Sequence, residues 1–130
     1  MVVEDDVPIR QFVERVLRGA GFATVVASDA TDALAKARAM QPMPLLVTDL
    51  VMPGMGGDEL ARELRQLDPS LKVLYVTGYA DHLFDERPML EDGEAFLEKP
   101  FTPRGLLEAA SLLLMGRTSG PQTQPQALWN

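Results

Sequence analysis

The chain has 130 residues, of which 46% are hydrophobic, so it is long enough to fold as one domain around a sizeable core. Its formal net charge of −7 argues against a protein that follows nucleic-acid phosphates, and the absence of cysteine excludes disulfides and suits a cytoplasmic location. No apolar run approaches the roughly 20 residues of a membrane span, so we expect contact with neither nucleic acid nor membrane.

Short apolar runs alternate with helical patterns along the chain. After a first strand at Val2 and Val3, Asp6 is placed to cap a helix, Pro8 falls in its opening turn, and Gly19 follows its last apolar residue. We expect the later elements, in chain order, as a strand at 23–27, a helix at 30–40, a strand at 45–48, a flexible glycine loop at 54–57, a helix at 60–67, a strand at 72–76, a short or irregular helix at 81–93, a strand at 95–97 and a helix at 102–114.

The end of the chain has a different composition. Residues 117–130 are rich in Gln, Pro, Ser and Thr, which predicts a disordered tail or linker. The folded domain is therefore expected at 1–116.

Five strands that alternate with five helices predict an α/β fold, a doubly wound and flavodoxin-like parallel sheet in the order 2-1-3-4-5. The carboxyl ends of parallel strands meet at one edge of such a sheet, where ligands bind. Glu4 and Asp5 follow the first strand and Asp49 follows the third, so these three acids should lie together. Thr77, after the fourth strand, and Lys99, after the fifth, should share the same edge.

Three carboxylates so close would repel one another unless a cation or protons intervened. Magnesium prefers oxygen ligands and keeps several waters, so one or two carboxylates, a backbone carbonyl and a phosphoryl oxygen would complete a Mg²⁺ site. A hydroxyl and a lysine beside these acids make a constellation for phosphoryl transfer, with Asp49 as the attacking carboxylate.

Four segments of the chain resemble the receiver domain of bacterial two-component response regulators, the CheY-like family. The resemblance covers residues 1 to about 116. The matching segments are Val2-Val3-Glu4-Asp5-Asp6, Asp49-Leu50-Val51-Met52-Pro53-Gly54-Met55-Gly56-Gly57, Val76-Thr77-Gly78 and Lys99-Pro100-Phe101.

The resemblance implies a magnesium-dependent phosphorylation switch. In it Asp49 is the phosphoacceptor, Glu4 and Asp5 bind the metal, and Val51 contributes its backbone carbonyl to the metal. Asp6 lies one position past the acid pair and fits the role of a helix cap better than that of a metal ligand. Self-phosphorylation and autodephosphorylation would be the extent of any enzymatic activity.

The resemblance also implies a signalling role for the fourth and fifth strands. Thr77 and Lys99 engage the phosphoryl group, and Phe96 occupies the aromatic switch position. Val51 and Tyr79 lie two residues past Asp49 and Thr77, and their side chains would overhang the phosphoryl group. Hydrolysis needs a water aligned with the phosphorus, and neither side chain orients such a water well. We therefore expect a long-lived acylphosphate.

The implied partners are proteins. The phosphoryl group would come from a histidine kinase or a histidine phosphotransfer domain, and the signal would leave through the face of the fourth helix, fifth strand and fifth helix. The segments 76–80 and 96–103 look most like receivers of hybrid sensor histidine kinases. Since no output domain is visible and the first strand lacks leading residues, the chain could be cut from such a kinase or stand alone.

Other interpretations stay open at this point. Asp5 could merely cap a helix, Lys99 could be a surface lysine, Phe96 could be core, and Tyr79 could face solvent as a partner-binding aromatic. A degenerate receiver would only bind partners. A dehalogenase-like phosphatase would need an acid where Val51 stands, and a flavodoxin would need a phosphate cradle where the first acids stand.

Overall fold

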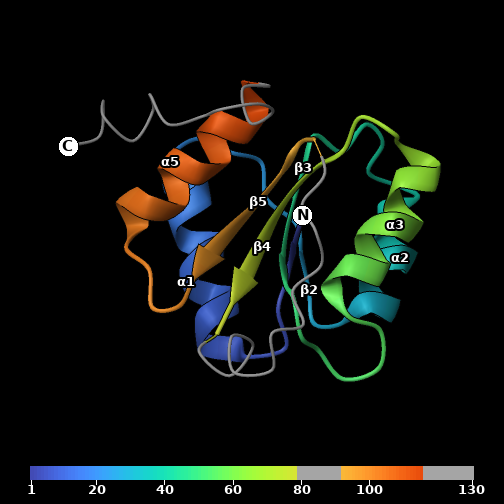
Figure 1. Cartoon of the computed structure of the whole chain (residues 1–130), viewed down its shortest axis with the longest axis horizontal. Helices are drawn as coiled ribbons and strands as arrows, with labels where there is room; N and C mark the ends of the chain where they lie inside the picture. The colour runs from blue at the N-terminus through green and yellow to red at the C-terminus, as the bar shows by residue number, and fades with distance from the viewer. Residues whose placement is uncertain (79–91, 116–130) are drawn as a thin grey trace.

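The computed structural model describes residues 1–78 and 92–115, in which a five-stranded parallel sheet lies between two layers of helices (Figure 1). The sheet order is β2-β1-β3-β4-β5, so the predicted doubly wound fold is confirmed. The elements are β1 (Val2–Val3), α1 (Val7–Gly19), β2 (Val26–Ala27), α2 (Ala30–Ala37), β3 (Leu45–Asp49), α3 (Gly57–Leu67), β4 (Lys72–Thr77), β5 (Glu94–Glu98) and α5 (Pro103–Leu114). The predicted tail at 117–130 and nearly all of the helix predicted at 81–93 lie outside the described residues.

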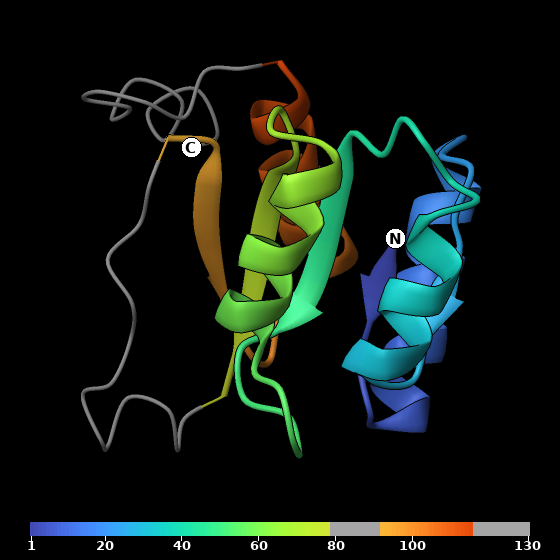
Figure 2. The same cartoon turned by 90° about the vertical axis from the view of Figure 1, so that its right-hand side faces the viewer.

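The helices cover the sheet in pairs: α1 and α5 lie on one face, and α2 and α3 lie on the other (Figures 1 and 2). Successive strand residues point to opposite faces, so Leu74 and Val76 pack toward α1 and α5, while Val73 and Tyr75 pack toward α2 and α3. Burial on both faces is why the strands read as continuous apolar runs. In the part of the chain that the structure describes, no helix is long and apolar enough to cross a membrane.

Two elements are shorter than predicted. The strand expected at 23–27 is reduced to Val26–Ala27, because β2 is an edge strand whose ladder pairs it with the two residues of β1 alone. The helix expected at 30–40 ends at Ala37, where the Gln41 side-chain amide donates a hydrogen bond to the Ala37 carbonyl.

Strands β3, β4 and β5 are longer than predicted. β3 extends through Asp49, β4 through Thr77, and β5 from Glu94 to Glu98. Their ladders pair Asp49 with Val76 and Thr77 with Glu98. Asp49 and Thr77 are therefore part of the hydrogen-bonded sheet, whereas Glu4, Asp5 and Lys99 follow the ends of strands.

Gly57 opens α3 and does not belong to the flexible loop that the glycines predict. A Cβ atom at Gly57 would lie 2.2 Å from the Asp49 carbonyl oxygen, which leaves room only for glycine. The start of α3 thus packs directly against the backbone that carries Asp49.

Candidate functional site

Three carboxylates gather at the carboxyl ends of the adjacent strands β1 and β3. Oxygen atoms of Glu4, Asp5 and Asp49 all lie within 4.8 Å of one another. Glu4 and Asp49 are buried, at 3% and 8% exposed, whereas Asp5 is open to solvent. An acidic set with one solvent-facing member has the oxygen donors that a hard divalent cation prefers.

Lys99 brings a positive charge to this cluster from the residue that follows β5. Its Nζ lies 3.2 Å from Glu4 Oε1 and 3.4 Å from Asp49 Oδ2. The backbone N–H of Lys99 donates a 2.7 Å hydrogen bond to the Thr77 carbonyl, which anchors the lysine to the end of β4. The structure therefore brings together residues from four segments that are far apart in sequence.

Burial and mutual charge shift the protonation of the cluster. Burial, followed by the charge of Asp49, raises the pKa of Glu4 to about 7. Burial also raises the pKa of Asp49, although the Lys99 charge opposes this. Burial favours the neutral amine of Lys99, but the charges of Asp49 and Glu4 together raise its pKa. Lys99 thus stays positively charged, whereas burial disfavours the ionised forms of Glu4 and Asp49.

Asp6 stands apart from the acidic cluster and has a structural role. Its side chain accepts a 3.1 Å hydrogen bond from the Ile9 N–H and caps α1, as predicted. Its own N–H donates to Glu4 Oε2 at 3.2 Å, and Arg10 donates to the Glu4 carbonyl at 2.8 Å. These contacts hold the backbone that presents Glu4.

Thr77 lies at the end of β4 and is fully buried. Within 1–78 and 92–115, its Oγ1 has no hydrogen-bond partner. A buried hydroxyl without a partner is costly, so this atom is poised to donate a hydrogen bond to an oxygen that enters the site.

The remaining predicted residues fall around the cluster. Val51 is 60% exposed two residues past Asp49, and Tyr79 lies outside the described residues. Phe96 is partly buried against the core, with its ring centroid 5.7 Å from that of Tyr75.

A buried polar network beneath Phe96 is absent from the sequence predictions. The Tyr75 hydroxyl donates to Glu94 Oε2 at 3.2 Å, and Arg65 of α3 pairs with the same carboxylate oxygen. Arg65 also donates to the Leu71 carbonyl from two of its nitrogens, at 3.2 and 3.1 Å. Single charged residues in a helix and a strand give no sign in the sequence that they will meet, so no pattern could have found this network.

An apolar cavity of about 540 Å³ opens beside the acidic cluster. It lies between the first turns of α1 and the segment after Lys99, with Pro8, Phe12 and Phe101 in its lining. The rings of Phe12 and Phe101 are 5.9 Å apart. The acidic site is therefore bordered by a hydrophobic surface.

The family model of the response regulator receiver domain matches residues 1–111. The chain belongs to this family. The receiver domain is similar to the response regulator receiver protein CpdR of Brucella abortus, with 32% identity over 115 residues that make up 88% of this chain and 95% of CpdR.

Two further proteins with similar receiver domains are longer than this chain or come from a longer protein. The DNA-binding response regulator MtrA of Mycolicibacterium paratuberculosis is 37% identical over 108 residues, 82% of this chain and 47% of MtrA, so the receiver domain spans about half the length of that relative. The crystal structure of the receiver domain from the hybrid histidine kinase CckA superposes with a TM-score of 0.73 at 28% identity, over 87% of this chain and 95% of that one. The predicted family is confirmed.

Proposed function

We propose that this receiver domain takes a phosphoryl group from a phosphohistidine onto Asp49 in a Mg²⁺-dependent reaction. A carboxylate oxygen of Asp49 attacks phosphorus, the phosphorus–nitrogen bond breaks, and its electron pair returns to the imidazole of the donor. The observation that carries the proposal is the buried Asp49 carboxylate, ion-paired with Lys99 and flanked by two further acids.

The donor set fits magnesium. Glu4, Asp5 and Asp49 are the residues that would hold the ion, together with the predicted carbonyl of Val51. When bound, the ion neutralises charge on the incoming phosphoryl oxygens and on the acids. Lys99, already paired with Asp49, is positioned to pair with the phosphoryl group that Asp49 acquires.

The buried Thr77 hydroxyl supports a switch that follows phosphorylation. Because Oγ1 has no partner among the described atoms, moving toward a phosphoryl oxygen costs it no hydrogen bond. Phe96, diagonal to Thr77 across the β4–β5 ladder, would then fill the vacated space. Phe96 has no hydroxyl, so packing alone sets its position.

The apolar cavity beside Lys99 supports docking of a histidine kinase or phosphotransfer domain. A protein that presents a phosphohistidine to Asp49 must cover the surface around it, and Pro8, Phe12 and Phe101 offer apolar contact there. The signal would leave through β5, α5 and the segment between β4 and β5. Similarity to the CckA receiver supports a place in a hybrid kinase as one setting for this function.

The test is incubation with acetyl phosphate and MgCl₂, followed by intact-mass analysis. Wild type should gain one phosphoryl group, about 80 Da by the chemistry of the added HPO₃. Asp49→Asn should gain none, and EDTA should abolish the gain. An equal adduct on Asp49→Asn would overturn the assignment.

Two neighbouring acids provide matched controls. Asp5→Asn removes a carboxylate of the cluster and should weaken Mg²⁺ binding measured by calorimetry. Asp6→Asn keeps a capping side chain outside the cluster, so phosphorylation should match wild type. A wild type that binds Mg²⁺ but gains no phosphoryl group from acetyl phosphate or from any phosphohistidine donor would favour a degenerate receiver that acts through protein contacts.

A further inference from the structure

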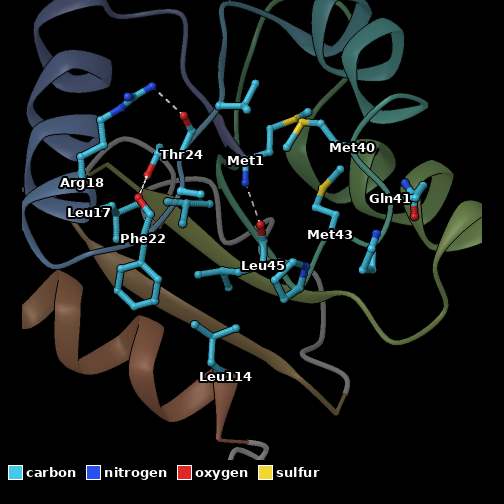
Figure 3. A pocket seen from close by; sticks show the side chains of 15 residues that line it. Met1, Leu17, Arg18, Phe22, Thr24, Met40, Gln41, Met43, Leu45 and Leu114 are labelled. Carbon is cyan, nitrogen blue, oxygen red and sulfur yellow. Dashed lines mark hydrogen bonds between the residues drawn. The ribbon is translucent and has the colours of Figure 1, made fainter.

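The β4 and β5 edge of the sheet carries a buried polar network on the side that faces α3. Tyr75 and Glu94 are 2% and 8% exposed, and Arg65 reaches Glu94 from α3. On the same side of the sheet, Met40 and Met43 line a largely apolar cavity of about 630 Å³ at the amino end of β1 (Figure 3). Apolar side chains of similar volume often replace a buried ion pair with no loss of stability, so stability alone does not account for the polar network.

The β4–β5 ladder places this network beside the expected switch residues. Tyr75 pairs with Phe96 across the ladder. Thr77 lies one pair nearer the acidic site than Tyr75, and Glu94 lies one pair further from it. Because residues two apart along a strand share a face, all four side chains lie on the same side of the sheet. Tyr75 and Phe96 are thus both neighbours of Thr77, one along the strand and the other diagonally across the ladder.

The hydroxyl of Tyr75 is bound at the side of its ring that lies away from Thr77. It donates a 3.2 Å hydrogen bond to Glu94 Oε2. Burial, followed by the charge of Glu94, raises the pKa of Tyr75, so the hydroxyl keeps the proton that it donates. Since Glu94 is one pair further from the acidic site, this bond directs the phenol ring away from Thr77.

The acceptor of this hydrogen bond is fixed in turn by α3. Arg65 pairs with the same carboxylate oxygen of Glu94. Arg65 also donates from two nitrogens to the Leu71 carbonyl, at 3.2 and 3.1 Å, so the guanidinium is held by two partners. The position of the Tyr75 ring therefore depends on a helix that is outside the β4–β5 pair.

Two aromatic rings are candidates to fill the space that Thr77 would vacate in the switch. The ring centroids of Tyr75 and Phe96 are 5.7 Å apart, and both residues lie next to Thr77 in the ladder. Either ring would bury apolar surface in that space, so packing alone does not choose between them. The bond to Glu94 does, because Tyr75 would have to break it in order to move, whereas the Phe96 ring has no hydroxyl to keep bonded.

We propose that Tyr75 is a positioning residue for the switch, because its hydrogen bond to Glu94 holds its ring away from Thr77. Phe96 is then the ring that responds when Thr77 moves. This inference rests on the proposed function, in which the Thr77 hydroxyl moves toward a phosphoryl oxygen. It gives α3 a role in the switch, since Arg65 secures the acceptor of the bond.

The test compares wild type with Tyr75→Phe, which keeps the ring and loses only the hydroxyl. In NMR of the unmodified proteins, the variant's ring at position 75 should gain contacts with the Thr77 methyl group. Loss of the bond should change the balance between the two positions of this ring by about fivefold. With beryllofluoride and Mg²⁺, the Phe96 ring should respond in wild type. In Tyr75→Phe, the ring at position 75 should respond in its place.

Glu94→Gln is the conservative partner variant, because its amide can still bond to the Tyr75 hydroxyl although its charge is gone. It should keep the wild-type response of Phe96 to beryllofluoride. A response as weak as that of Tyr75→Phe would assign the effect to the ion pair with Arg65 and would overturn the role of the hydrogen bond.

Two further results would overturn the proposal. Identical contacts of the ring at position 75 in unmodified wild type and Tyr75→Phe would show that the hydroxyl does not hold the ring. An equal response of Phe96 in the two proteins would show that Tyr75 does not select the ring that moves. Failure of the proposed function is seen separately, as the absence of an acetyl phosphate adduct, and the contacts in the unmodified proteins still decide whether the bond holds Tyr75.

Discussion

Glu4 is buried beside Asp49, so ionising both carboxylates at once costs free energy. Among the described contacts, Lys99 supplies the positive charge that offsets these two carboxylates. A proton held by Glu4 up to near neutral pH relieves the same repulsion that a divalent ion would relieve. A proton and a divalent ion would thus compete for one group of oxygens.

The first prediction at the residue scale concerns the pH dependence of unfolding in EDTA. The pKa of Glu4 is about 7 in the folded chain against 4.5 for an ordinary glutamate, so the folded state holds more protons between these values. Stability should therefore be full below about pH 4.5 and should fall as pH rises to 7, by roughly 2–3 kcal/mol from this group. Urea unfolding at several pH values measures the slope.

Glu4→Gln is the control for that slope, since the amide has nearly the same shape and does not titrate. The variant should lose the fall in stability between pH 4.5 and 7. An unchanged slope in Glu4→Gln would assign the effect to other groups.

The lifetime of the acylphosphate is a second prediction at this scale. Val51 is 60% exposed beside Asp49 and has no polar group to orient an attacking water. Tyr79 holds the matching position after Thr77 in the sequence. Val51→Asn/Tyr79→Glu should shorten the half-life of phosphorylated Asp49 by about tenfold or more, where each tenfold is ~1.4 kcal/mol of barrier. Loss of the 80 Da adduct with time measures this, and a double mutant no faster than wild type would contradict it.

At the scale of single elements, the start of α3 packs against the backbone of Asp49, the proposed phosphoacceptor. A Cβ at Gly57 would press on the Asp49 carbonyl, so Gly57→Ala should cost about 1–3 kcal/mol and slow phosphorylation by displacing Asp49. Gly19→Ala is the matched change, because its Cβ meets nothing within 4 Å at the end of α1. That variant should be neutral or stabilised by up to about 1 kcal/mol. Equal urea midpoints for the two variants would contradict the close approach at Gly57.

The network of Arg65, Glu94 and Tyr75 ties α3 to β4 and β5. The charge of Glu94 contributes, after burial, to raising the pKa of Tyr75. Arg65→Met leaves the Glu94 carboxylate buried without its guanidinium partner and should cost about 3–5 kcal/mol. The double variant Arg65→Met/Glu94→Met should recover most of this loss in urea unfolding. A double variant as unstable as Arg65→Met would show that packing, and not charge, sets the cost.

The elements differ in how far the sequence predicts them. Helix caps are local signals: Asp6 caps α1 as predicted, and Thr102 caps α5 in the same way. The length of β2 depends on its neighbour β1, and the place of Gly57 depends on the Asp49 backbone, so neither follows from local pattern. The meeting of Glu4, Asp49 and Lys99 could be predicted because parallel topology gathers strand ends. That the Thr77 hydroxyl has no partner among the described residues depends on packing, which the sequence does not encode locally.

At the scale of the whole molecule, the two ends of the sheet differ in the chemistry of their side chains. The carboxyl end carries charged residues from β3 and from the segments after β1 and β5, and the amino end carries the apolar cavity. Thr77 belongs to β4, which pairs with β5 along its length and packs with α5. We therefore expect a change at the acidic site to reach β5 and α5 first. Within the sheet, β2 lies at the far edge and pairs with β1.

The last prediction follows from this asymmetry. Beryllofluoride with Mg²⁺ mimics the phosphoryl group on Asp49, so it should draw the Thr77 hydroxyl toward the mimic and shift the packing of Phe96 against Tyr75. Hydrogen exchange should then change in β4, β5 and α5, whereas residues 23–43, around β2 and α2, should exchange as before. NMR of the Phe96 ring gives the matching local readout, and Thr77→Val, which keeps the shape but lacks the hydroxyl, should abolish both responses. Equal changes on both sides of the sheet, or a Phe96 signal indifferent to the mimic, would show that Thr77 and Phe96 do not couple the site to this face.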